Sequence, residues 1–433
     1  MIRLDRLTIK KTDPPLFLLA LYAFVSPLGN LARFGTHEGA YGISTVLMIL
    51  IILVTFRSSL SKIRNNAILF SLTILVGWMV LSSIFAQDQA DAYVKSISLV
   101  FYILLAAAAY RYIQNERQIL FVVIMFLIGA FMSSTATFID YFDFVDIPGV
   151  NDIRAGTGSK YVGYSMQISG AFPRRSAMAA YYTIAITIGF LMPLLHCKLS
   201  RVQQIFYFTT AVSCFFVLMM THNRAGLIGA VIATTLIPII SARSWKRLLW
   251  LMAIYLFFMA IIIFIIYNWF YDVWVAYQIL LRIGEVGEDD PSNVAESDIL
   301  RLVFFQRAMA ALLENPFGHG YSLLHGVPGY SGMVDPHNIV TQVIWGMGVF
   351  SFFWLIYFTI IFIIKARFLF VKINKKSAID IGFVLLGGLL AFFLNNMMHN
   401  SLSTGVAWIF LGLLLGLINR LKASEVIITG KKS

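Results

Sequence analysis

Three histidines in one polar segment are the residues of this chain best suited to acid–base chemistry. The segment from Glu314 to Phe350 reads ENPFGHGYSLLHGVPGYSGMVDPHNIVTQVIWGMGVF and contains His319, His325 and His337. His337 ends the glycine-rich loop and is followed by an apolar run, so its backbone is expected at the boundary of a predicted membrane helix. A histidine with a pKa of about 6.5 can accept a proton at neutral pH, which makes His337 a candidate general base.

A metal site is the alternative for these histidines. Together with Asp335, the three imidazoles offer four potential ligands. Their separations in the sequence fit no standard zinc spacing. The sequence therefore predicts neither a metal nor another cofactor.

Arginines at predicted helix ends form a second group of candidates. Arg224 lies in MMTHNRAGLIGA between two apolar runs, where inserting a charged side chain costs about 2.5–3.5 kcal/mol. Such a residue normally has an interaction partner or a functional role. The alternative for Arg224 is that its side chain snorkels to lipid headgroups. Arg174 and Arg175 begin another apolar run, where headgroup anchoring accounts for at least one of them.

Arg301 lies on a predicted amphipathic helix. Apolar residues recur there at helical spacing, namely Ile299, Leu300, Val303, Phe304, Ala308 and Leu312. We expect this helix to lie against the membrane or the helical bundle, which gives Arg301 a fixed position. Arg307, on the same helix, would point elsewhere and is expected to be dispensable for activity.

The composition identifies the class of protein that must position these residues. The chain has 433 residues, of which 59% are hydrophobic and 12% charged, whereas soluble domains average about 45–50% apolar and about 25% charged. Apolar runs of roughly 20 residues can cross a bilayer as helices, and these runs lack the alternation of a β-barrel. We therefore predict an all-α, polytopic integral membrane protein in which residues 1–433 form a single membrane domain.

The hydropathy pattern predicts about twelve membrane-spanning segments. They cover approximately residues 16–33, 40–56, 67–86, 96–110, 118–138, 176–196, 205–222, 226–241, 249–270, 338–364, 379–398 and 404–420. If the N-terminus is cytoplasmic, the segments on the cytoplasmic side contain most of the lysine and arginine residues. The positive-inside rule therefore predicts that both termini are in the cytoplasm. Two long loops, 139–175 and 271–337, then face the outside, and the second lies between the ninth and tenth spans.

Several function classes are disfavoured. The net charge of +12 follows mostly from the inside–outside asymmetry, and no basic stripe with interleaved aromatic residues predicts nucleic-acid binding. The absence of a P-loop and of GxGxxG after a strand disfavours an ATP-driven pump and a dinucleotide enzyme. A transporter or flippase for lipid-linked sugars is the strongest alternative of another class, although transporters usually show internal repeats and polar residues in both halves.

Three motifs together resemble the O-antigen ligase and polymerase superfamily of bacterial envelope enzymes. They are THNRAG at a span end, RLVFFQRAMAALLENPFGHGYS, and PHNIVTQVIWGMGVFSFF, over roughly residues 160–360. The family pattern is an arginine in a short outer turn, an arginine heading a helix that ends in a Pro- and Gly-containing turn, and a His-Asn pair entering the next span. The matching positions here are Arg224, Arg301 and His337.

The resemblance implies an inverting, metal-independent glycosyltransferase that moves a glycan from an undecaprenyl-diphosphate carrier to lipid A–core. It implies a multi-pass protein of the bacterial inner membrane, in contact with membrane lipids and with a periplasmic active site. His337 would be the base, while Arg224 and Arg301 would hold the diphosphate, since the forked donors of arginine match phosphate oxygens. Substrate-binding roles follow for Asn338, Arg174, Arg175, Gly318, Gly320 and His319. The alternative within the family is an O-antigen polymerase, which joins carrier-linked repeat units.

Two features depart from the family pattern. Members often have a Pro-Asn pair entering the span after the first long outer loop, where this chain has FPRRSAMAAYY. Many have Ser or Thr before the first arginine, where Asn223 stands here. Neither change removes a charged group, so the expected chemistry is kept.

Overall fold

The described part of the chain is helical. The computed structural model describes residues 14–32, 42–113, 115–141, 175–196, 199–221, 223–241, 294–327, 332–336, 338–369, 376–397 and 404–430, with a few isolated positions between them. Within these ranges the extended structure is limited to short bridges such as the antiparallel pair Leu324 and Val334. The predicted all-α class is confirmed.

The helices follow the apolar runs of the sequence. They are α1 (Pro14–Val25), α2 (Ile43–Arg64), α3 (Ala67–Ser82), α4 (Gln89–Tyr112), α5 (Glu116–Tyr141), α6 (Arg175–Leu195), α7 (Arg201–Met220), α8 (Arg224–Ser241), α11 (Val294–Glu314), α12 (Ile339–Met347), α13 (Phe350–Ala366), α14 (Lys376–Asn396) and α15 (Gly405–Gly430). Nine helices in the described ranges are long and apolar enough to cross a membrane, and the apolar helices at 14–29 and 225–241 are shorter. The predicted span 249–270 lies outside the described residues, so the number twelve stays a prediction.

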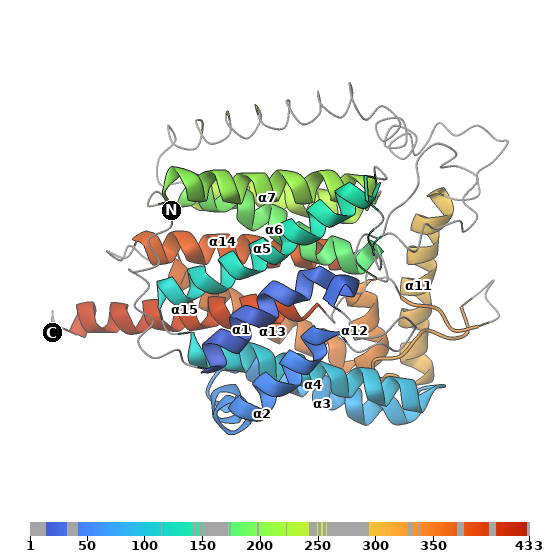
Figure 1. Ribbon diagram of the computed structural model, residues 1–433. Coiled ribbons are helices and arrows are strands. Elements are labelled where there is room, and N and C mark those ends of the chain that lie inside the picture. Colours follow the sequence, from blue (N-terminus) through green and yellow to red (C-terminus); the bar gives the residue numbers. More distant parts are fainter. Residues whose placement is uncertain are drawn as a thin grey trace.

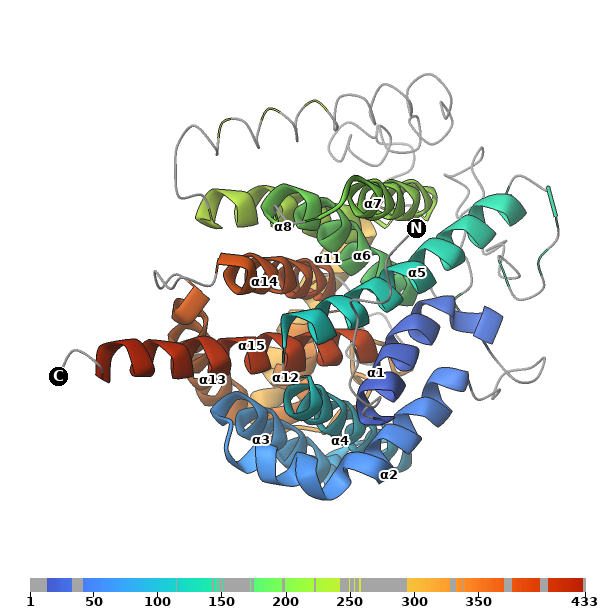
Figure 2. The same cartoon turned by 60° about the vertical axis from the view of Figure 1, so that its left-hand side comes forward.

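The spanning helices form a layered bundle. Figure 2 shows α6, α7 and α8 on one side of α14, and α2, α3 and α4 on the far side of α15. Close packing uses small residues, as is usual where helices pack without a hydrophobic driving force. A Cβ atom on Gly387 of α14 would lie 2.5 Å from the Leu191 side chain of α6, and one on Gly412 of α15 would lie 2.2 Å from the carbonyl oxygen of Ala106 on α4.

Helix α11 lies across one end of this bundle (Figure 1). Its inner face buries Phe304 and Ala308, which pack with Trp345 of α12 in a small separate core. Its outer face leaves Leu313 91% exposed. The prediction of an amphipathic helix that lies against the bundle is confirmed.

The prediction of one continuous span over 338–364 is wrong. The segment divides into α12 and α13 at Gly348, which has a φ of 61°. The carbonyl oxygen of Pro316 occupies the break, because it accepts a hydrogen bond of 2.9 Å from the amide of Val349 and lies where a Cβ on Gly348 would be. The short helix α12 is buried, whereas most of α13 is exposed.

The turn between α7 and α8 lies at the same end of the bundle as α11. Gly229, near the start of α8, packs against backbone near the end of α14. The start of α14 packs on late α15, with Gly382 near Leu417, so the end of α14 lies toward the start of α15. Helix α15 runs parallel to α4, with Trp408 stacked on Tyr102. The first half of α4 contacts the loop after α11. The starts of α8, α15 and α4 and the loop after α11 therefore lie at the same end of the bundle.

Candidate functional site

The PFGHG turn, residues 316–320, is bound to the end of α12. The amide of His319 donates to the carbonyl oxygen of Trp345 at 2.9 Å, and that of Gly320 donates to Gly346 at 3.1 Å. The last carbonyl groups of a helix have no partner within the helix. The turn supplies these partners, which explains why α12 can end inside the protein.

Glycine is required at two positions of this turn. Gly318 and Gly320 have φ values of 86° and 67°, in the left-handed region that disfavours other residues. A Cβ on Gly318 would lie 2.4 Å from the Gly346 carbonyl oxygen, and one on Gly320 would lie 2.1 Å from the Ser83 hydroxyl. These glycines therefore allow close approach of protein backbone, and their predicted contact with a sugar stays a prediction.

The end of α3 forms the other wall of the turn. The Ser82 hydroxyl donates to the carbonyl oxygen of Gly346 at 2.7 Å and accepts the amide of Gly320 at 3.1 Å. The indole of Trp78 donates to the carbonyl oxygens of Phe317 at 3.0 Å and Met347 at 3.2 Å. Sequence reasoning missed both residues. The available signal was a tryptophan and a serine pair closing an otherwise apolar run, in GWMVLSSIF.

His319 is held in one orientation beneath the turn. Its side chain is 6% exposed and stacks on Trp345 with ring centroids 4.2 Å apart. Its Nδ1 lies 3.0 Å from the carbonyl oxygen of Phe85. Because a carbonyl can only accept, Nδ1 carries the proton and Nε2 has the free lone pair. Nε2 is buried and finds no hydrogen-bond partner among the residues that the structure describes.

His325 packs beside His319, and Arg307 fixes both. The two imidazole rings meet edge to face with centroids 5.2 Å apart. Arg307 Nε donates to the carbonyl oxygen of His325 at 2.9 Å, and its guanidinium lies over the Trp345 ring. Burial lowers the pKa of both histidines below the usual value, and the charge of Arg307 adds to this effect. Both rings are therefore neutral at neutral pH.

Arg307 also forms a two-pronged ion pair with the end of its own helix. Its Nη1 and Nη2 atoms donate to the two carboxylate oxygens of Glu314 at 2.5 Å and 2.8 Å. This hydrogen bonding holds the pKa of Glu314 below its usual value. Arg307 thus anchors α11 to the loop. Contrary to the expectation that Arg307 is dispensable, its replacement should lower the stability of the protein.

The histidines are not gathered as a metal site in the described residues. His319 and His325 are neighbours, but no three His, Cys, Asp or Glu side chains within the described ranges could hold an ion together. His337 lies outside those ranges. The expectation of metal-independent chemistry therefore stays a prediction.

Asn338 caps α12. Its side-chain oxygen accepts the amides of Val340 at 2.7 Å and Thr341 at 3.3 Å, which satisfies donors that the first turn leaves free. His337 precedes this cap in the sequence and lies outside the described residues. A substrate contact for Asn338 stays a prediction.

A second asparagine caps the helix that Arg224 begins. Asn223 is buried, and its side chain accepts the amide of Gly226 at 2.9 Å. Ser, Thr and Asn all cap helices well, which explains why asparagine can replace the Ser or Thr common in the family. Gly226 packs on α6, where a Cβ would lie 2.9 Å from the Thr183 hydroxyl. The structure thus gives Arg224 a fixed backbone at the start of α8.

The arginine side chains themselves lie outside the described part. The structure describes the backbone of Arg175, Arg224 and Arg301, at the start of α6, the start of α8 and within α11, while Arg174 is outside the described residues. The starts of α8 and α12, the PFGHG turn and α11 share one end of the bundle.

The comparisons with known proteins bear on this end of the bundle. Residues 209–356 match the family model described as O-antigen ligase. A search for similar curated proteins found no match. The matched residues include the turn between α7 and α8, all of α11, the PFGHG turn and α12. Residues 209–356 are therefore similar to the O-antigen ligase family, in agreement with the three motifs.

Proposed function

We propose that this protein is an O-antigen ligase that transfers a glycan from an undecaprenyl-diphosphate carrier to lipid A–core at the periplasmic face of the bacterial inner membrane. The transfer inverts the anomeric carbon and needs no metal. His337 is the general base, and Arg224 and Arg301 bind the diphosphate. Both termini are cytoplasmic in this proposal.

One observation carries the proposal. The family segment, 209–356, contains the start of α8, α11, the PFGHG turn and the cap of α12, which lie at one end of the bundle. At that end the side chains of Ser82 and Trp78 bind the backbone of the PFGHG turn. An enzyme that acts on a substrate carried in one leaflet needs its groups at one membrane face.

The residue types fit the reaction. The acceptor hydroxyl attacks the anomeric carbon, its proton passes to His337, and the bond from that carbon to the phosphate oxygen breaks. The carrier diphosphate leaves with the bonding electrons, and fixed arginine charge stabilises it in place of a divalent ion. A base of this kind typically contributes about 10²–10⁴-fold to the rate.

The alternative is an O-antigen polymerase, in which the acceptor is a second carrier-linked repeat unit. It would use the same donor and the same residues. The match to the O-antigen ligase family favours the ligase. A lipid-linked sugar transporter is less consistent with the match to the O-antigen ligase family.

The experiment compares two acceptors. Purified protein in liposomes receives carrier-linked glycan with either lipid A–core or a second carrier-linked repeat. Transfer to lipid A–core supports the ligase, and growth of the carrier-linked chain supports the polymerase. Movement of the glycan across the bilayer without a new glycosidic bond would contradict both and favour a transporter.

A further inference from the structure

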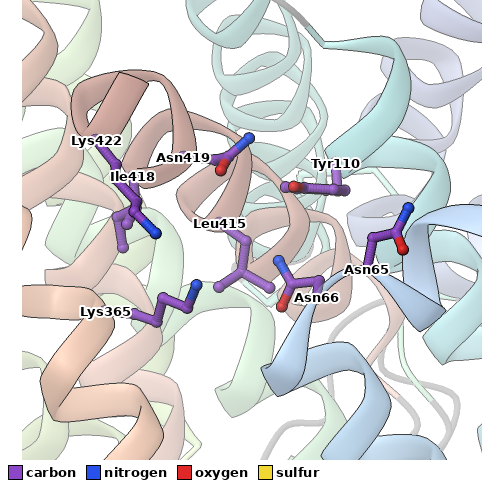
Figure 3. Close-up of a pocket in the computed structure, with 8 residues that line it drawn as sticks. All are labelled: Asn65, Asn66, Tyr110, Lys365, Leu415, Ile418, Asn419 and Lys422. Carbon is purple, nitrogen blue, oxygen red and sulfur yellow. The ribbon is translucent and has the colours of Figure 1, made fainter. Parts of the chain in front are cut away.

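A cationic pocket lies at the end of the bundle opposite to the candidate site. Figure 3 shows its lining residues, which are Asn65, Asn66, Tyr110, Lys365, Leu415, Ile418, Asn419 and Lys422. They come from the turn between α2 and α3 and from the late parts of α4, α13 and α15. The space between these residues is about 320 Å³, open solvent at its mouth included. It is thus bounded by four separate parts of the chain.

The opposite ends of α3 separate the pocket from the candidate site. Asn66 precedes the first residue of α3, whereas Ser82 at its last turn contacts the PFGHG turn. A helix of this length spans about 24 Å. A ligand in the pocket is therefore a different molecule, or a different part of the membrane, from the one near the PFGHG turn.

Two lysines from different helices enter this pocket. Figure 3 shows the amino groups of Lys365 and Lys422 directed into the same space, and their charges repel one another. No carboxylate lines the pocket, and within the described ranges neither lysine forms an ion pair. Two like charges that share a pocket without an acidic partner favour a bound anion.

The remaining polar groups can donate hydrogen bonds to such an anion. The oxygen of the Asn66 side chain accepts the amides of Ile68 and Leu69, so its NH2 group is left as a donor. Tyr110 presents its hydroxyl toward the lysines (Figure 3). The pocket thus combines two fixed charges with neutral donors, which suits phosphate oxygens.

We propose that this pocket binds the phosphate group of an anionic phospholipid and thereby joins α13 to α15 and α3. The proposal does not depend on the glycan-transfer function. The shared chemistry is a phosphate anion, and its two possible sources are a lipid headgroup and free phosphate.

The surface of α13 favours the lipid as the source. Ile356, Ile360 and Ile363 are 61%, 51% and 62% exposed, so this face of α13 contacts acyl chains when the protein is in a bilayer. Membrane lipid is therefore present beside the helix that supplies Lys365. Because so little of α13 is buried, a bridging lipid would add substantially to its attachment.

The test measures thermal unfolding of the purified full-length protein in a non-ionic detergent at constant ionic strength. Phosphatidylglycerol, phosphatidylcholine and inorganic phosphate are added separately. Phosphatidylglycerol should raise the Tm in a saturable way, while net-neutral phosphatidylcholine should have little effect. The double variant Lys365→Gln/Lys422→Gln should bind phosphatidylglycerol about tenfold more weakly or worse, since each lysine contributes to attraction of anionic lipid.

The matched control removes two charges that do not line the pocket. Lys62→Gln/Arg111→Gln changes α2 and α4 near the same end and should respond to phosphatidylglycerol as the natural protein does. If the double lysine variant fails to fold, Lys422→Gln alone changes an exposed side chain and keeps the test available. A lysine-dependent shift with inorganic phosphate of the same size would support the anion chemistry with free phosphate as its source. Equal responses of the lysine variant and the natural protein in every arm would overturn the proposal.

Discussion

The Nδ1 atom of His319 lies 3.0 Å from the carbonyl oxygen of Phe85, which joins the loop after α11 to the end of α3. Phe85 follows Ser82 and Ser83, which contact the same loop. The end of α3 is therefore a fixed support for the PFGHG turn, and α12 is held between them. The predictions below test this support separately from the chemistry.

Gly320→Ala should destabilise the protein. The substitution places a side chain at a φ of 67° and a Cβ 2.1 Å from the Ser83 hydroxyl. Left-handed backbone and overpacking together cost about 2–4 kcal/mol. The measurement is the Tm in detergent. Gly332→Ala is the control, since a Cβ there meets no atom within 4 Å. An equal decrease of the Tm in both variants would contradict the inference that position 320 requires glycine.

Asn338 variants separate capping from substrate contact. Asn338→Ala removes the acceptor for Val340 and Thr341, which should cost about 0.5–2 kcal/mol. Asn338→Ser keeps a capping oxygen and should restore most of the Tm. If Asn338 also binds substrate, glycan transfer by the serine variant stays low. Full activity of Asn338→Ser would show that Asn338 caps α12 and that its side chain is not needed for substrate binding.

Stability should fall when the pH is lowered from about 6.5, the usual histidine pKa in an unfolded chain. Burial lowers the folded-state pKa of His319 and His325, so the unfolded chain binds more protons in the interval between the two values. Unfolding is then favoured as the pH falls, and the Tm should be nearly constant above pH 7. Differential scanning fluorimetry of His319→Gln/His325→Gln should show a smaller decrease across this interval. An unchanged slope would mean that other groups cause it.

Arg307→Ala should lower the Tm more than Glu314→Gln. The arginine variant loses a hydrogen bond to the His325 carbonyl at a cost of about 1–2 kcal/mol. The carboxylate end of the pair is 56% exposed, and exposed ion pairs contribute about 0–1 kcal/mol. Thermal unfolding of both variants measures the difference. The reverse order would show that the ion pair matters more than the backbone contact.

The sequence predicts the membrane bundle and α11 because hydropathy and helical periodicity are local properties. It does not predict the break at Gly348, because residues on both sides of it are apolar. The cause is the carbonyl group of Pro316, which approaches from another segment. The role of Trp78 was missed for the same reason, since its partners lie more than 200 residues away in the sequence. His319 was predicted as a site residue, but its support by Phe85 needed the structure.

The most direct test of the proposed mechanism is glycan transfer from carrier to acceptor by purified His337→Ala in liposomes, normalised to the amount of folded protein. We expect turnover to fall by about two to four orders of magnitude while donor binding stays nearly unchanged. Arg201→Ala, an exposed change at the opposite end of α7 from the Arg224 turn, should transfer at the natural rate. Near-natural transfer by His337→Ala would contradict its assignment as the base.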